Sequence, residues 1–131
     1  MDLHLVGGFL GSGKTTAIIE ASRLLLERGK RVGVVTNDQG RFLVDTAFFR
    51  GASVPAVEVT GGCFCCNYED LTGLVSRLAE RDRPDVIFAE SVGSCADIVA
   101  TVVKPLRTIA GVPADLRSFS VFADCRLLDR H

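Results

Sequence analysis

Gly-Gly-Phe-Leu-Gly-Ser-Gly-Lys-Thr-Thr, residues 7–16, directly follows a short apolar run at the start of the chain. Residues 8–15 match the phosphate-binding pattern Gly-x-x-x-x-Gly-Lys-Ser/Thr in full. In this pattern the glycines let backbone N–H groups close around phosphate oxygens, and the helix that opens at the lysine adds its positive dipole end. Lys14 is expected to reach the β- and γ-phosphates and Thr15 to bind magnesium. A chance glycine-rich turn is the alternative, but a strand before the loop and a helix after it disfavour that interpretation. The stretch therefore predicts a nucleotide-binding loop.

The remaining sequence alternates between strand-like and helix-like segments. Apolar or β-branched runs that predict strands lie at 3–6, 31–36, 54–60, 85–90 and 118–123. Helical spacing predicts a helix from Lys14 to a stop at Gly29, another across 71–79 closed by Pro84, and one over 98–110 interrupted by Pro105. Residues 41–50 show weaker helical spacing. This order predicts an α/β fold of the P-loop NTPase type, with a mostly parallel sheet and helices on both faces.

Composition narrows the classes of partner. The chain has 131 residues, enough for one domain, and its 15 Lys+Arg against 16 Asp+Glu favour neither nucleic acid nor a membrane as partner. No stretch approaches transmembrane length, and the start of the chain is not typical of a signal peptide. Five cysteines, an odd number, then indicate a reducing cytoplasm, where thiols serve as metal ligands or core residues.

Acidic residues at strand ends are candidates to complete the nucleotide site. A nucleoside triphosphatase needs a carboxylate beside the loop to hold magnesium, directly or through water, and Glu90 ends a predicted strand. Three residues on, Gly93 offers an N–H to the γ-phosphate with no side chain in the way. Asp38 is the other acid that could approach the γ-phosphate or order a water, and a role in capping the turn at Gly40 is an equal alternative. The catalytic candidates are Lys14, Asp38 and Glu90. The residues expected to bind the nucleotide are Gly8, Gly11, Ser12, Gly13, Lys14, Thr15, Thr16 and Gly93.

A second cluster is built from thiols. Cys63, Cys65 and Cys66 lie within four residues, directly after two glycines, and thiolates are soft ligands for zinc and other late transition metals. Three sulfurs leave one position of a tetrahedral site unfilled, which favours an open or transient site, with Glu58 or a second molecule of the chain, as a homodimer, as the candidate completing ligand. A packing role and a reactive dithiol are the alternatives. The two remaining cysteines, Cys95 and Cys125, and also His4, are interpreted as structural residues, the cysteines as small buried ones.

Together the motifs resemble those of the CobW-type metal-handling GTPases. The resemblance rests on residues 7–16, on Asn37-Asp38-x-Gly40, on Glu58 ahead of Gly62-Cys63-x-Cys65-Cys66, and on Glu90-x-x-Gly93. It implies GTP as the nucleotide, magnesium at Thr15 and Glu90, and phosphate binding by residues 11–15. It also implies a switch segment over 37–45 that includes Asp45. The thiols would handle zinc or cobalt for a client metalloprotein, or nickel, as in the related GTPases that insert nickel into urease and hydrogenase.

The chain also departs from the family pattern. Asp38-Gln39 stands where the family usually has Glu-Phe, and Val92-Gly93 where it has Thr-Gly. No Asn/Thr-Lys-x-Asp tetrapeptide, which reads guanine in the family, occurs in these residues, nor does the family's smaller C-terminal domain. We therefore expect residues 1–131 to be the N-terminal part of a P-loop GTPase domain, incomplete at its C-terminus.

The function predicted from the sequence is GTP hydrolysis coupled to capture or release of a transition metal at the three cysteines. The first alternative is a P-loop ATPase or small-molecule kinase whose cysteines are structural. The second is a non-catalytic module that senses metal or redox state and uses the nucleotide only for structure.

Overall fold

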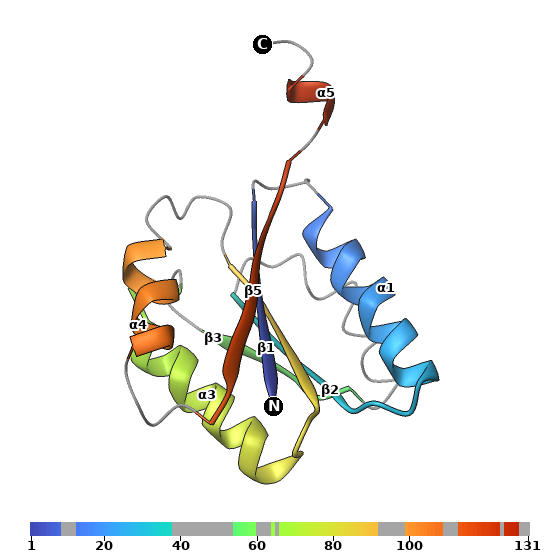
Figure 1. Cartoon of the computed structure of the whole chain (residues 1–131), viewed down its shortest axis with the longest axis vertical. Coiled ribbons are helices and arrows are strands. Elements are labelled where there is room, and N and C mark those ends of the chain that lie inside the picture. The colour runs from blue at the N-terminus through green and yellow to red at the C-terminus, as the bar shows by residue number, and fades with distance from the viewer. Residues whose placement is uncertain are drawn as a thin grey trace.

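The fold is known from a computed structural model, which describes residues 1–8, 13–37, 54–59, 64, 66–91, 99–108, 113–123 and 125–128. Figure 1 shows a sheet between helices, with the carboxyl ends of the strands at the top of the view. The strands are β1 (Asp2–Gly8), β2 (Val32–Asn37), β3 (Ala56–Val59), β4 (Val86–Glu90) and β5 (Asp115–Phe122). The helical segments are α1 (Lys14–Glu27), α3 (Tyr68–Arg81), the π-helical turn η1 (Val99–Val103), α4 (Lys104–Thr108) and the single turn α5 (Cys125–Leu128).

The described strands form one parallel sheet in the order β3-β2-β4-β1-β5. The first strand of the chain therefore lies between the fourth and the fifth, and its Val6 pairs with Glu90 of β4. Because parallel strands end at the same edge of a sheet, the tips of β1 and β4 lie next to each other. The predicted α/β fold with a parallel sheet is confirmed.

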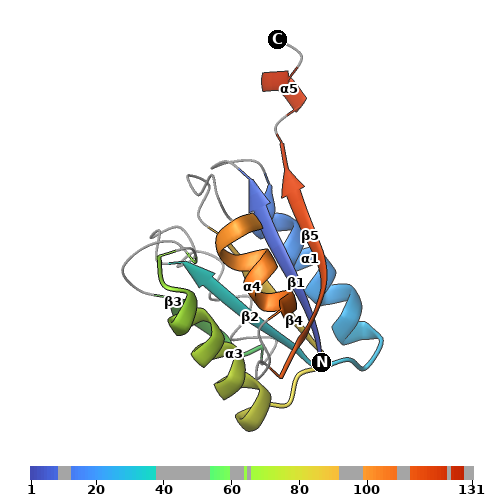
Figure 2. The same cartoon turned by 60° about the vertical axis from the view of Figure 1, so that its left-hand side comes forward.

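Each face of the sheet carries its own hydrophobic core, because alternate residues of a strand point to opposite faces. α1 covers one face, and α3 and α4 cover the other (Figures 1 and 2). The core under α1 consists of Val6, Ile18, Val32, Val34, Val54, Val86 and Phe88. The core under α3 and α4 consists of Leu3, Leu5, Val35, Val59, Phe64, Leu71, Val75, Leu78, Ile87, Ala89, Val102 and Leu106. Helices on both faces, as predicted, follow from this two-sided burial.

The ends of the helices show why they begin and stop where they do. α1 opens after Gly13, whose φ of 97° is left-handed, and it closes at Gly29, with φ 75°. There the N–H of Gly29 donates to the carbonyl of Leu26 and the N–H of Lys30 to that of Leu25. This is the hydrogen-bond pattern of a Schellman motif, and it confirms the predicted stop at Gly29.

Three segments differ in detail from the sequence prediction. β5 begins at Asp115 rather than at 118, and β3 is limited to four residues after Pro55. Across 99–108 a π-helical turn runs directly into α4 just before Pro105, so the predicted interruption at Pro105 is a change of helix type. The segment 41–50, predicted to have helical spacing, lies outside the described residues.

No helix in the described part of the chain has the length and apolarity needed to span a membrane.

Candidate nucleotide-binding site

The candidate site lies at the carboxyl edge of the sheet, where β1 ends, α1 begins and β4 ends (Figure 1). Lys14, the first residue of α1, is only 7% exposed. Its Nζ donates to the carbonyl oxygen of Gly8 at 2.6 Å and to that of Ser91 at 3.3 Å. The ammonium group is therefore held between the tip of β1 and the residue that follows β4.

Thr15 and Glu90 meet at the same edge. The hydroxyl of Thr15 donates to Oε1 of Glu90 at 2.8 Å. Glu90 is 9% exposed, because it ends a strand whose five residues are all buried. A hydroxyl and a carboxylate are hard oxygen ligands of the kind that Mg²⁺ binds through one or two protein groups, so this donor set fits the cation.

Burial and charge act in opposite directions on Lys14. Burial lowers the pKa of the Lys14 ammonium, and the nearby Glu90 carboxylate raises it, with burial the larger effect. An additional anion at this site would favour the charged form of Lys14 in the same way that Glu90 does.

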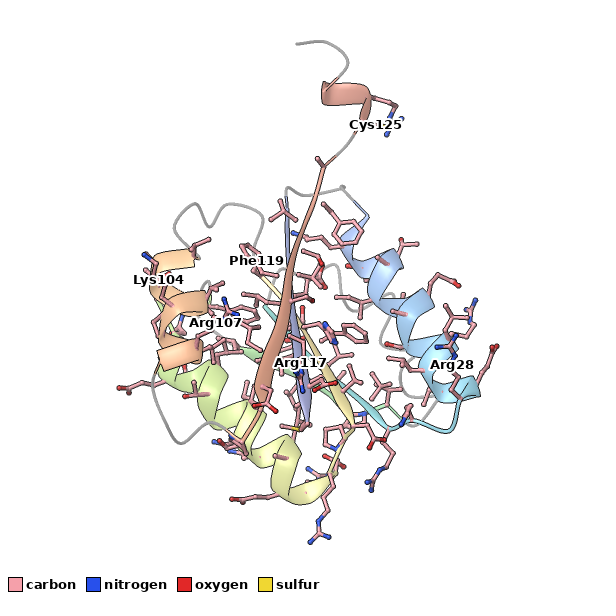
Figure 3. The ribbon with its side chains drawn as sticks, in the orientation of Figure 1. Arg28, Lys104, Arg107, Arg117, Phe119 and Cys125 are labelled. Carbon is pink, nitrogen blue, oxygen red and sulfur yellow. The ribbon has the colours of Figure 1, made fainter. Side chains whose placement is uncertain are left out.

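Gly7 and Gly8 allow the end of β1 to lie close to its neighbours in the fold. Gly8 has a φ of 132°, and a Cβ there would lie 2.3 Å from the carbonyl oxygen of Phe122 on β5. A Cβ at Gly7 would lie 3.0 Å from Cε1 of Phe119, the ring labelled in Figure 3. The ring of Phe119 and the backbone of Phe122 thus lie close to the end of β1. Neither residue could be singled out from the sequence, because only the pairing of β5 with β1 places them there.

The remaining predicted nucleotide residues divide into two groups. Gly13, Lys14 and Thr15 are described as above, and Thr16 is exposed in the first turn of α1. The others lie outside the described residues, and they are Gly11, Ser12, Asp38, Asp45 and Gly93.

The thiol motif is described only in part. Cys66 is exposed, and Cys63 and Cys65 lie outside the described residues. Phe64, between them, is fully buried in the core under α3 and α4. Phe64 is therefore anchored in that core, a role that was not predicted from the sequence although an aromatic residue between cysteines could have suggested it.

No group of three or more His, Cys, Asp or Glu side chains in the described ranges could hold a metal ion. Glu58, the candidate fourth ligand, is exposed on β3, where its Cα pairs with that of Thr36. Since Val57 and Val59 face the core under α3 and α4, Glu58 belongs to the other face of the sheet. The position of Glu58 relative to Cys63 and Cys65 stays a prediction.

Of the residues interpreted as structural, one prediction was wrong. Cys125, expected to be buried, is exposed on α5, which lies beyond the carboxyl edge of the sheet, where it gains no cover from α1, α3 or α4 (Figures 1 and 3). Cys95 lies outside the described residues. His4 is a strand residue, as expected, with its Nδ1 2.7 Å from the hydroxyl of Ser118 and its ring 5.7 Å from that of Phe88.

Comparison with known proteins fits this geometry. The family model described as "CobW/HypB/UreG, nucleotide-binding domain" matches residues 2–121. The chain belongs to this family. The resemblance to CobW-type metal-handling P-loop GTPases that the motifs indicated is thereby confirmed.

Relatives of this CobW/HypB/UreG domain include the zinc chaperone CobW of a Sinorhizobium species, which is 38% identical over 68% of this chain and 27% of that protein. The zinc-regulated GTPase metalloprotein activator 1 of Dictyostelium discoideum is 32% identical over 71% of this chain and 22% of that protein. The chain thus spans about a quarter of the length of these relatives.

The fold is also similar to that of a protein of known structure. The crystal structure of the signal recognition particle receptor FtsY from Elizabethkingia anophelis superposes with a TM-score of 0.61, at 22% identity. The match covers 85% of this chain and 37% of that one, and it supports the fold assignment of the CobW/HypB/UreG domain.

Proposed function

We propose that this chain is the nucleotide-binding part of a GTPase that couples its nucleotide state to the binding of a transition metal at Cys63, Cys65 and Cys66. The metal is the cargo, zinc or else cobalt or nickel, and it is delivered to a client metalloprotein. The observation that carries the proposal is the convergence of Lys14, Thr15 and Glu90 at the carboxyl edge of the sheet. We expect the protein to bind and deliver the metal in the cytoplasm, where thiols stay reduced.

The reaction we propose is phosphoryl transfer from GTP to water. Lys14 and the loop amides at Gly11, Ser12 and Gly13 would bind and orient the phosphates, and Lys14 would neutralise charge on the transferred group. Thr15 and Glu90 would hold magnesium, which would neutralise negative charge on the phosphates. Asp38 would orient the attacking water, and Gly93 would contact the γ-phosphate through its N–H. Because catalysis of this kind is mostly positioning, we expect slow intrinsic turnover.

The metal half of the proposal rests on the thiol motif and on the relatives. Two of them are named as a zinc chaperone and as a zinc-regulated GTPase metalloprotein activator. The burial of Phe64 ties the motif to the same core that β1 and β4 share, which offers a physical route between the two sites. Glu58, or a second copy of the chain in a homodimer, would supply the remaining ligand.

Guanine selectivity is the part of the proposal that rests on the family alone, because the guanine-reading tetrapeptide does not occur in the sequence. We propose that residues 1–131 are the N-terminal part of the GTPase domain, since the chain spans about a quarter of the length of the relatives above.

A thermal-shift comparison tests whether the site prefers guanine or adenine. GTP should raise the melting temperature more than ATP at equal concentration, and the reverse order would favour the ATPase or kinase alternative.

The coupling is tested by titrating Zn²⁺ with and without a magnesium-bound, non-hydrolysable GTP analogue. We expect the zinc dissociation constant to change by about fivefold or more between the two states, the usual scale of coupling between sites. Cys66→Ser should weaken zinc binding. Cys125→Ser, which alters the exposed cysteine on α5, should leave zinc binding unchanged. Equal zinc affinities in the two states would overturn the coupling, because a ligand with no preference shifts no equilibrium. Equal loss in the two cysteine variants would remove the thiol motif from the proposal.

A further inference from the structure

Ser91, the residue directly after β4, joins the elements that carry the site. Its N–H donates to the carbonyl oxygen of Val6 at 2.9 Å, and its hydroxyl donates to the same oxygen at 3.1 Å. Its own carbonyl oxygen accepts from Nζ of Lys14 at 3.3 Å. The side chain is buried, with 4% of the residue exposed. One residue thus fastens the end of β4 to the end of β1 and also holds the lysine.

The hydroxyl has a specific mechanical effect. A single N–H bond to Val6 lets the Ser91 peptide rotate about it, whereas a second bond from the hydroxyl fixes the orientation of the residue. That orientation aims the carbonyl oxygen at Lys14 and sets the direction of the preceding Glu90, whose Cα pairs with that of Val6. Buried hydrogen bonds of this kind restrict a site to one arrangement.

The space for this hydroxyl is provided by a neighbouring glycine. A Cβ at Gly7 would lie 3.2 Å from Oγ of Ser91, closer than nearly all real contacts of that type. The phosphate loop and the end of β4 are therefore fitted to each other at Gly7 and Ser91.

We propose that Ser91 is a positioning residue of the nucleotide site, whose hydroxyl keeps Lys14 and Glu90 in the arrangement that magnesium and phosphate require. It does not itself touch the nucleotide. This inference rests on the proposed function, since it concerns the same site.

The test measures binding of a fluorescent GTP analogue to the chain over a series of Mg²⁺ concentrations. In Ser91→Ala the carbonyl of Val6 keeps its bond from the Ser91 N–H, so the variant should fold. Loss of one hydrogen bond should weaken binding of the analogue in magnesium by about threefold to tenfold, and the Mg²⁺ concentration for half-maximal binding should rise. Ser91→Thr, which keeps the hydroxyl, should restore most of the affinity.

Ser118→Ala is the matched control. It removes the hydroxyl of a half-buried serine, which is bonded to His4 at 2.7 Å, and it should lower the melting temperature without moving the Mg²⁺ requirement. An equal rise of the Mg²⁺ requirement in both alanine variants would overturn the inference, and so would wild-type behaviour of Ser91→Ala, or a Ser91→Thr that binds no better than Ser91→Ala. Absence of magnesium-dependent binding in the wild-type chain would instead overturn the proposed function, and this inference with it.

Discussion

Glu90 accepts a hydrogen bond of 2.8 Å from the hydroxyl of Thr15, although the two residues lie 75 positions apart in the chain. The contact exists because β1 and β4 are neighbours in the sheet, so the start of α1 and the end of β4 share one edge. Next to this contact lies the buried ammonium of Lys14, and the Glu90 carboxylate favours its charged form. These three side chains form a charged and polar cluster at the end of an apolar sheet.

Glu90→Gln should separate the charge of this residue from its shape. The amide can still accept from Thr15, but it no longer offers a carboxylate to a divalent cation. Since hydrogen bonds and contacts to charged groups are worth more than neutral ones, we expect about a tenfold loss in magnesium-dependent affinity for a GTP analogue. Binding measured with and without Mg²⁺ checks this, with exposed Glu80→Gln on α3 as control. A uniform loss in both conditions would contradict a role in binding the cation.

Two glycines should respond to alanine in opposite directions. Gly8→Ala places a Cβ 2.3 Å from the carbonyl oxygen of Phe122 and forces alanine to a φ of 132°. We expect it to lower the free energy of unfolding by about 2 kcal/mol or more. Gly73 lies within α3, and a Cβ there meets no heavy atom within 4 Å. Gly73→Ala should therefore raise the free energy of unfolding by about 0.5–1 kcal/mol through helix propensity. Denaturant unfolding of the three proteins measures both, and a stable Gly8→Ala would contradict the close approach of β5.

The local motifs and the class of fold could be predicted from the sequence because their signals are local. The phosphate loop at residues 7–16 follows one predicted strand, and Glu90 ends the predicted strand over 85–90. Because parallel strands end at the same edge of a sheet, Glu90 is expected near Lys14. The stop of α1 at Gly29 is equally local, since the left-handed turn needs that glycine.

The contacts across the sheet could not be predicted in the same way. The closeness of Phe122 to Gly8, and of Ser91 to Gly7, depends on the register of β5 and β4 against β1. β5 was expected to begin at 118, but it pairs from Asp115 with a register irregularity between Leu3 and His4, and no local pattern signals such a shift. Cys125 was misjudged for a related reason, because its burial depends on what packs around α5 and not on its residue type.

Phe64→Ala should show how far the thiol motif depends on its anchor. The ring is fully buried in the core under α3 and α4, together with Leu71 and Val75. Removing it creates a cavity and should lower the free energy of unfolding by about 3–5 kcal/mol, whereas Leu24→Ala at a half-exposed site on α1 should change it by about 0.5 kcal/mol or less. Phe64→Leu should keep most of the stability.

The same Phe64 variants carry a second measurement. If the ring holds the neighbouring cysteines in place, zinc affinity should fall in Phe64→Leu even though the chain remains folded. Unchanged zinc affinity in Phe64→Leu would show that the thiols need no anchor.

Asp85 should account for part of the pH dependence of the stability of the fold. Its carboxylate accepts a hydrogen bond from the backbone N–H of Arg31 at 2.8 Å, and that bond, followed by the charges of Arg31 and Lys30, lowers the pKa of Asp85 below its ordinary value of 3.8. Because the folded pKa is the lower one, this contact stabilises the fold fully above pH 3.8, and the contribution is lost as the pH falls through the folded pKa. Asp85→Asn should therefore lower the melting temperature at pH 7, and the difference from wild type should shrink below pH 3.8. Melting curves between pH 7 and 3 measure it, with exposed Glu80→Gln on α3 as control, and a difference that grows on acidification would reverse the assigned sign.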